Sequence, residues 1–302
     1  MRTAYLGTSD FAATVLRRLA ASPHRPALVV APPDRPRGRG RRLSPPPAAA
    51  AARQLGLELV QSGDVNDPET VAAIGAVEPD AIAVCAFGQL ISEPLLSELM
   101  LNVHPSLIPR WRGAAPIERA IMAGDQTTGV TIMRVTEGLD SGPVALRQEV
   151  PLGPDEYYDT VANRLADLGG ELLVQSLDLL EDGGLEFSDQ DEAEATYADK
   201  VAASERHLDP ARPAAELTRI VRALNPRIGT HLELEDGGRL GVREAEALGS
   251  GPAQGAIEIG EGGPVLGTSE GGLRLATVQP PGGRPMTAED FLRGHQAPAR
   301  AI

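Results

Sequence analysis

Short apolar runs alternate with helix-like stretches along the first half of the chain. Runs rich in Val, Ile, Leu and Ala occur at 3–7 (TAYLG), 26–31 (PALVVA), 57–61 (LELVQ), 80–87 (DAIAVCAF) and 101–104 (LNVH). Between them lie helix-like segments at 11–22, 48–56, 68–77 and, more briefly, 96–100. Strands buried on both faces have this composition, so the alternation predicts an α/β fold with a mostly parallel sheet.

The pattern continues with two further strands and a long helix that closes the first domain. Strands are predicted at 129–135 and 143–152, and apolar residues spaced by three and four predict a helix from about 155 to 182. The first helix should begin at Asp10, whose side chain is placed to cap it. Ligands of such sheets bind beyond the carboxyl ends of the strands, so the residues that follow each run are the candidate site.

A second, smaller domain follows an acidic segment. Residues 188–206 are poor in large apolar side chains and are predicted to be a linker between a domain at 1–187 and a domain at 207–302. In the second domain, one helix at 214–225 precedes short strand-like runs at 231–235, 238–248, 255–260 and 273–280. Glycine pairs break these runs, which predicts a small β-barrel. A capping box at Thr287–Asp290 predicts a last short helix.

The composition favours a folded cytoplasmic protein. No run approaches the roughly 20 apolar residues that a membrane span needs, and the chain enters a strand-like run at once, so we expect no membrane segment and no signal peptide.

The single cysteine, Cys85, lies in an apolar run, which predicts a buried thiol and no internal disulfide. The five histidines lack metal-ligand spacing, so no metal site is expected. Neither GxGxxG nor GxxxxGK[ST] occurs, which argues against a dinucleotide site.

Positive charge is concentrated in one loop of an acidic chain. The formal net charge is −14 at pH 7, whereas residues 31–47 (APPDRPRGRGRRLSPPP) carry a cluster of arginines. They are Arg35, Arg37, Arg39, Arg41 and Arg42. Such a segment can be a solvated excursion, but its position between a strand and a helix and its stiff prolines favour phosphate binding. Binding depends on potential within about 8 Å, so the negative total does not prevent it.

Three polar residues near strand ends could carry chemistry. Asn102 and His104 are two residues apart at the end of a predicted strand, so they share a face, and Asp140 lies in a glycine-flanked loop after another strand. An amide and an imidazole that donate to an oxyanion, beside a carboxylate that orients the imidazole, suit acyl transfer to an amine. Alternatively, Asn102 caps a loop, His104 is a satisfied core histidine and Asp140 is a turn residue. Nearby Trp111 either packs in the core or stacks on a base at the rim.

Two longer motifs resemble one enzyme family. NVHPSLIPRWRGAAPIERAI and, later, EGLDSGP are similar to the folate-dependent formyltransferases, which share N-x-H-x-S-L-L-P followed by G-x-D-[ST]-G. The arginine loop, RWRGAAPIERAI and PPGGRPMTAEDFLRG resemble the branch of that family that acts on methionyl-tRNA. The resemblance covers nearly the whole chain.

The resemblance implies a Rossmann-like catalytic domain, a linker and an OB-like barrel that helps to hold tRNA. It implies transfer of formyl from 10-formyltetrahydrofolate to the α-amino group of methionine on initiator tRNA, in translation initiation. By position it makes Asn102, His104 and Asp140 the catalytic trio. The implied folate-contacting residues are Ser106, Leu107, Ile108, Pro109, Phe87, Gly88, Gln89, Leu90 and Ile91. Arg112 and the five loop arginines are the expected tRNA contacts.

Two other functions remain as alternatives. One is formyl transfer to an amino sugar or another small amine, or hydrolysis that releases formate from the same folate. The other is a non-catalytic paralogue that binds folate or RNA. Initiator methionyl-tRNA and the folate are the expected partners, DNA and membranes are not, and the modest size and acidic charge are compatible with a monomer.

Overall fold

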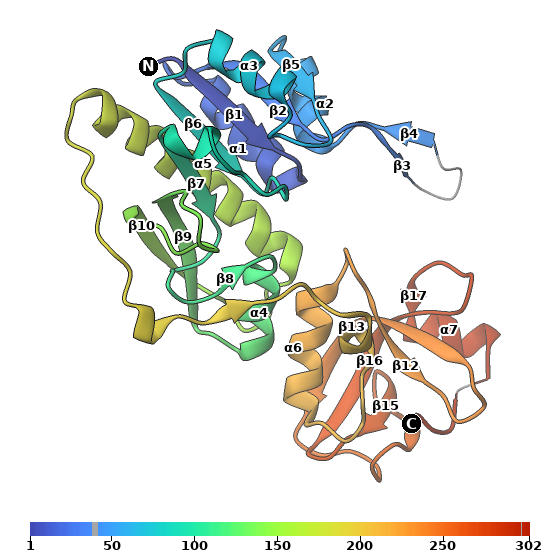
Figure 1. The fold of residues 1–302 in the computed structure, drawn as a ribbon. Helices are drawn as coiled ribbons and strands as arrows, with labels where there is room; N and C mark the ends of the chain where they lie inside the picture. The colour runs from blue at the N-terminus through green and yellow to red at the C-terminus, as the bar shows by residue number, and fades with distance from the viewer. Residues whose placement is uncertain (38–41, 297) are drawn as a thin grey trace. The chain divides into compact units, whose positions relative to one another are not determined.

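The structure is a computed structural model that describes residues 1–37, 42–296 and 298–302 (Figure 1). Its contacts divide the chain into two compact units. Unit 1 comprises Met1–Pro116, Thr127–Pro151 and Ala162–Ala198, and unit 2 comprises Ile117–Gln126, Leu152–Val161 and Asp199–Ile302.

Unit 1 is built on a seven-stranded sheet with the order β10-β9-β7-β6-β1-β2-β5. The strands are β1 (Thr3–Gly7), β2 (Pro26–Ala31), β5 (Glu58–Gln61), β6 (Ala81–Cys85), β7 (Met100–His104), β9 (Thr127–Arg134) and β10 (Val144–Pro151). Pairing is parallel from β5 to β7, and β9 and β10 add antiparallel pairs at one edge. The prediction of an α/β fold with a mostly parallel sheet is confirmed.

Helices cover this sheet where the periodicity predicted them. They are α1 (Asp10–Ala20), α2 (Pro47–Gln54), α3 (Pro68–Ala76) and α5 (Tyr158–Glu181), whose first residues belong to unit 2. The run at 96–100 instead gives a short 3₁₀ turn, Leu95–Ser97. The predicted cap of α1 was wrong, because extended Ser9 accepts the bond from the Ala12 amide and Asp10 is already helical.

Close packing beneath the sheet holds β7 in place. Gly169 of α5 lies so near β7 that a Cβ there would stand 2.7 Å from the Val103 side chain. Cys85, which ends the neighbouring strand β6, is fully buried, and this burial raises the pKa of its thiol to about 12. The predicted buried thiol is confirmed. Strands β6 and β7 therefore emerge from a tightly packed core.

The arginine segment forms a hairpin that leaves the end of β2. Strands β3 (Arg35–Arg37) and β4 (Arg42–Ser44) pair antiparallel, with Pro36 opposite Leu43 (Figure 1). Leu43 is 70% exposed. The described part of the segment is thus regular structure.

Unit 2 contains a six-stranded antiparallel sheet. Its strands are β12 (Thr230–Glu233), β13 (Arg239–Leu248), β14 (Ile257–Gly260), β15 (Gly263–Gly267), β16 (Gly272–Gln279) and β17 (Met286–Thr287). The C-terminal tail bridges both edges, since Arg300 pairs with Ala256 and Ala301 pairs with Leu234. This closes the sheet in the manner of the predicted barrel.

Three helices belong wholly or mainly to unit 2. They are α4 (Pro116–Ala123), α6 (Ala214–Leu224) and α7 (Ala288–Gly294). Thr287 accepts a hydrogen bond from the Asp290 amide, so the predicted cap of α7 is confirmed. Strand β15 was absent from the predicted runs, because only three residues lie between its first and last glycines, which gives too short a pattern. Among the helices of the described residues, none is long and apolar enough to cross a membrane.

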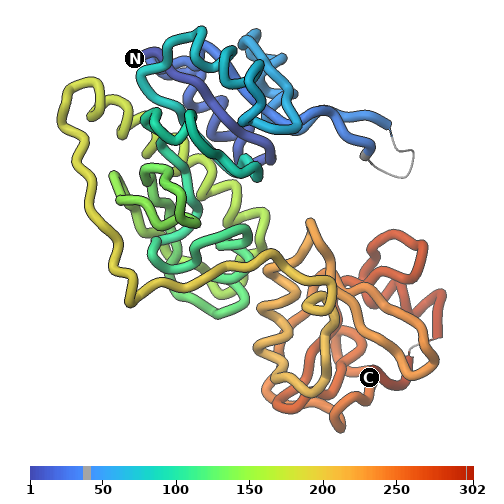
Figure 2. Tube along the Cα trace, in the orientation of Figure 1, coloured from blue at the N-terminus to red at the C-terminus, as the bar shows by residue number. Residues whose placement is uncertain are grey.

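The segment predicted to be a linker has structure of its own. After α5 the chain, yellow in Figures 1 and 2, returns along unit 1, where β11 (Tyr197–Ala198) pairs in parallel with β8 (Arg112–Gly113). Two 3₁₀ turns, Glu192–Glu194 and Ala203–Arg206, complete it. The division at 188 and 206 stays a prediction, while residues 188–198 pack as part of unit 1.

Candidate active site

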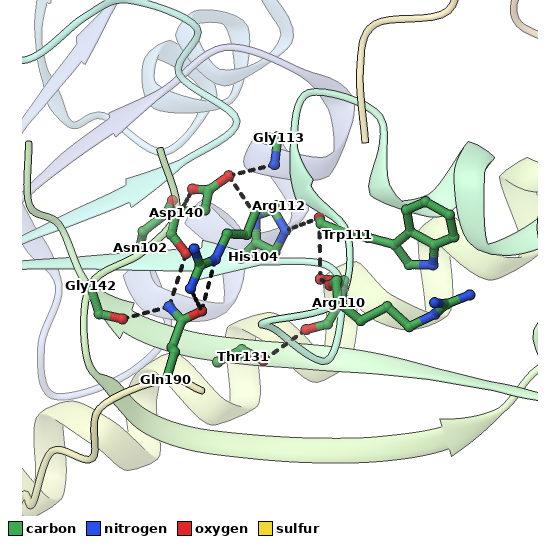
Figure 3. A network of polar contacts seen from close by, with 11 residues as sticks. Asn102, His104, Arg110, Trp111, Arg112, Gly113, Thr131, Asp140, Gly142 and Gln190 are labelled. Carbon is green, nitrogen blue, oxygen red and sulfur yellow. Dashed lines mark hydrogen bonds and ion pairs between the residues drawn. The ribbon is translucent and has the colours of Figure 1, made fainter. Parts of the chain in front are cut away.

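The predicted catalytic residues lie together at the end of β7, where the loop between β9 and β10 approaches that strand. Asn102 and His104 share one face of β7, where they pair with Met133 and Thr131 of β9. Asp140 lies in the loop between β9 and β10, and its side chain points back toward both residues (Figure 3). His104 is buried, whereas the Asp140 side chain keeps 17% of its surface exposed.

Asp140 is the centre of the cluster. One carboxylate oxygen, Oδ2, accepts a 2.8 Å hydrogen bond from the Gly113 amide and stands 3.6 Å from His104 Nδ1. The other, Oδ1, lies 3.4 Å from Asn102 Nδ2. Asp140 has a φ of 47°, a left-handed conformation that a non-glycine residue adopts only when its surroundings hold it there. The loop is therefore shaped to present this carboxylate.

The imidazole of His104 is fixed on its second nitrogen. Nε2 lies 2.9 Å from the carbonyl oxygen of Trp111. A carbonyl oxygen only accepts, so Nε2 carries the proton and donates it. The orientation leaves Nδ1 facing the Asp140 carboxylate.

The turn after β7 is also anchored. Ser106 Oγ donates to the Arg110 carbonyl at 2.7 Å, and the buried Thr131 hydroxyl donates to the Ser106 carbonyl at 2.7 Å. Ile108 is fully buried, while Leu107 and Pro109 are half-buried. This turn, the candidate folate contact, is thus held from β9.

The second candidate folate segment follows β6 and has mixed exposure. Phe87 is buried, while Leu90 is 81% exposed and Ile91 is half-buried. Gln89 uses its side chain within the fold, because it accepts from the Val65 amide and donates to the Ser62 carbonyl. At Gly88, with a φ of 76°, a Cβ would meet open space.

The structure separates the six candidate tRNA-binding arginines. Arg35 and Arg42 are exposed on the β3–β4 hairpin, and Arg37 lies on β3. Arg39 and Arg41 lie outside the described residues.

Arg112 does not reach a surface, contrary to expectation. It has 2% of its side chain exposed, and its guanidinium binds both carboxylate oxygens of Glu192, at 2.8 and 2.9 Å. Hydrogen bonding between them raises the pKa of Arg112 and lowers that of Glu192. Arg112 is therefore a buried, paired cation in this structure, and its expected contact with tRNA stays a prediction.

Trp111 is half-buried and its indole carries the Arg110 guanidinium, which stands 4.4 Å from the ring centroid (Figure 3). This cation–π contact occupies one face of the ring. Trp111 is thus neither fully packed in the core nor fully exposed at the rim, the two positions that the sequence left open.

Three residues of the segment after α5 belong to the site but gave no sequence signal. Gln190 donates to the carbonyls of Asp140 and Gly142, and Glu192 pairs with Arg112. The Thr196 hydroxyl accepts from the Trp111 amide at 2.9 Å. An acidic segment without apolar periodicity predicts a linker, so long-range side-chain partners of this kind were missed.

Comparison with known proteins now decides the family. The family described as "Formyl transferase" matches residues 1–177, and "Formyl transferase, C-terminal domain" matches residues 200–296. The chain is 41% identical to a methionyl-tRNA formyltransferase of Methylococcus capsulatus over 98% of this chain and 97% of that protein. The chain belongs to the methionyl-tRNA formyltransferase family. A member from Halorhodospira halophila is 42% identical over 98% of this chain and 96% of its own.

Solved structures share the fold of this family member. HypX from Aquifex aeolicus gives a TM-score of 0.67 at 19% identity, over 98% of this chain and 48% of that chain. WlaRD, described as a sugar 3N-formyl transferase, gives 0.66 at 13% identity, over 90% of this chain and 96% of its own. Similarity at this identity shows the fold alone.

Proposed function

We propose that this protein transfers the formyl group of 10-formyltetrahydrofolate to the α-amino group of methionyl initiator tRNA. The product, N-formylmethionyl-tRNA, serves translation initiation. The observation that carries this proposal is the match, over nearly the whole of both chains, to proteins named methionyl-tRNA formyltransferase. The cluster of Asn102 and His104 around Asp140 is the chemistry that such a transfer needs.

The folate would lie across the ends of two adjacent parallel strands. The turn at 106–109 follows β7 and the segment at 87–91 follows β6, and these strands pair in parallel. Ligands of open α/β sheets bind at such strand ends. The exposed Leu90 side chain offers apolar surface for the ring system, and HypX, which shares the fold, has been described in complex with tetrahydrofolic acid.

The reaction forms one bond and breaks one. The methionyl amine attacks the formyl carbon, the bond from that carbon to the folate nitrogen breaks, and the proton lost by the amine passes to that nitrogen. Ordinary α-amino groups have pKa values of about 7.7–8.0, so a useful fraction of the amine is neutral near pH 7. Such an amine needs placing more than activating.

Asn102 and His104 would donate to the oxygen that becomes negatively charged in the intermediate. A preorganised donor of this kind is worth about 100- to 1000-fold in rate. His104 Nε2 donates to the Trp111 carbonyl in the structure, so it must exchange this partner for the formyl oxygen during turnover. Asp140, between both side chains, orients them.

The arginine hairpin would bind the acceptor end of the tRNA. Exposed Arg35 and Arg42 place positive charge on a structure that leaves the sheet at the carboxyl end of β2, the same edge at which β7 presents the candidate site. The segment from 207 onward has ten arginines against twelve acidic residues, so its barrel would assist rather than dominate tRNA binding.

We further propose that the enzyme acts in the cytoplasm as a monomer.

The test is transfer of labelled formyl from 10-formyltetrahydrofolate to methionyl initiator tRNA. Free methionine and methionyl elongator tRNA are run in parallel. Transfer confined to the initiator tRNA is the expected result. Consumption of the folate without transfer to any tRNA would show that the acceptor is wrong.

A further inference from the structure

The segment after α5 contacts both loops that hold Asp140, and one side chain joins them. We propose that Gln190 is a positioning residue for formyl transfer, because its amide fixes the Asp140 carboxylate relative to Asn102 and His104. This inference rests on the proposed function for its kinetic consequence. Its structural consequence, the place of the carboxylate, can be measured separately.

One side of the Gln190 amide holds the loop that carries Asp140. Nε2 donates to the Asp140 carbonyl at 2.9 Å and to the Gly142 carbonyl at 2.6 Å (Figure 3). Both carbonyls belong to the turn in which Asp140 has a left-handed φ of 47°. Gly142 itself lies against the Arg134 carbonyl, which a Cβ would approach within 2.0 Å. A strained turn persists only where its surroundings determine it, and Gln190 supplies two of those contacts.

The other side of the amide holds the loop that carries Gly113. Gln190 Oε1 accepts from Arg112 Nε at 3.0 Å and from Arg112 Nη2 at 2.7 Å. Gly113, the next residue, donates its amide to Asp140 Oδ2 at 2.8 Å. The backbone that binds the carboxylate and the backbone that carries it therefore meet at one side chain.

Only a side chain with both a donor and an acceptor satisfies this arrangement. Two carbonyls require N–H groups, and the Arg112 guanidinium, which has no acceptor atom, requires an oxygen. Glutamate at position 190 would keep the oxygen for Arg112 but would turn a second oxygen toward the two carbonyls. Gln190→Glu therefore breaks one half of the link with almost no change of shape.

The experiment compares Gln190→Glu with Gln148→Glu in the full-length protein. Gln148 is exposed on β10 and makes none of the contacts that place Asp140, so the control introduces the same charge outside that network. A misplacement of about 1 Å at a reacting group can cost about 100-fold. We expect the kcat of formyl transfer to fall roughly 10- to 100-fold in Gln190→Glu, with the KM for tRNA and for the folate within about twofold of the control.

The amide resonance of Gly113 provides the independent signature. In ¹⁵N-correlated spectra its proton should move upfield in Gln190→Glu, because the hydrogen bond to Asp140 lengthens, and should stay in place in Gln148→Glu. If Gln190→Glu does not fold, as judged by its melting transition, Gln190→Met and Gln148→Met make the same comparison without added charge.

A kcat within threefold of the control, or an unmoved Gly113 resonance in a folded variant, would overturn the inference. An increase in KM at constant kcat would overturn it as well. Absence of formyl transfer in both wild type and control would instead refute the proposed function, and the Gly113 resonance would still decide the placement of Asp140.

Discussion

Two loop regions of unit 1 are built in opposite ways. Around Asp140, the loops at 109–113 and 138–142 are tied to each other and to the segment at 190–198 by hydrogen bonds, and the Arg112 side chain is buried. The β3–β4 hairpin has its own backbone pairing, with Arg35, Arg42 and Leu43 exposed. In the loops around Asp140, polar groups make internal contacts, whereas the hairpin presents polar groups to solvent.

The difference corresponds to two physical tasks. Stabilising an oxyanion requires donors held within a fraction of an ångström, which an internally bonded loop provides. Attracting a polyanion requires exposed cations, and their Coulomb energy changes slowly with distance. Arg112 in the first region is structural, whereas Arg35 and Arg42 in the second are exposed and available for recognition.

Thiol labelling should show the largest contrast between the buried framework and the hairpin. Cys85 has a pKa raised to about 12 by burial, so at pH 8 only about one thiol in 10⁴ is ionised. Leu43→Cys places a thiol at an exposed position, where its pKa should be ordinary. We expect the introduced thiol to react with DTNB at least about 1000-fold faster than Cys85. The rate is measured by the absorbance of the product that DTNB releases.

The wild-type protein, with Cys85 alone, is the control, and guanidinium chloride should make both thiols reactive. Because thiolate forms as pH rises, labelling of native Cys85 should increase with pH until unfolding limits it. Equal labelling rates in the native protein would contradict the contrast.

Asn102→Ala should reduce activity by about 100- to 1000-fold, because it removes a donor to the developing oxyanion. The loss should fall mainly on kcat, measured with saturating methionyl-tRNA and folate. Asn163→Ala, at an exposed position of α5, is the matched control and should retain full activity. Turnover of Asn102→Ala within tenfold of the wild type would show that Asn102 is not an oxyanion donor.

Replacing Arg35, Arg37 and Arg42 by Ala should weaken tRNA binding in a salt-dependent way. Each neutralised phosphate contributes about −0.9 to the slope of log affinity against log salt for B-DNA. If all three arginines contact phosphates, raising the salt from about 50 to about 200 mM should weaken tRNA binding by the wild type roughly 40-fold more than binding by the variant. The readout is tRNA affinity across a salt series.

The control replaces Arg2, Arg17 and Arg18, which are exposed elsewhere in unit 1, and changes the net charge equally. A slope reduced by the same amount in both triple variants would mean that overall charge, rather than the hairpin, attracts the tRNA.

Thr131→Val should lower the free energy of unfolding by about 1–3 kcal/mol, because it leaves the buried Ser106 carbonyl without its donor. Thr127→Val, exposed at the start of the same strand, should change it by less than about 0.5 kcal/mol. Urea denaturation measures both. Equal stabilities would show that the turn after β7 does not depend on this hydrogen bond.

Much of the framework could be predicted because it depends on local spacing. The five parallel strands and the covering helices followed from runs of apolar residues, since burial on both faces of a strand leaves a continuous pattern. Asn102 and His104 could be placed on one face because the period of a strand is two. Strand β15 and the cap at Ser9 were missed because short elements and single-residue boundaries leave weak patterns.

The sequence by itself determined the sheet, the closing helix, the shared face of the Asn–His pair and the concentration of charge in the hairpin. Tertiary structure alone decided that Arg112 is buried, that His104 Nε2 binds the Trp111 carbonyl, and that Gln190 joins two loops. Periodicity and charge are properties of neighbouring residues. A hydrogen-bond partner that lies seven residues away across a turn, or fifty to eighty residues away along the chain, depends on how the chain folds back, which local spacing does not encode.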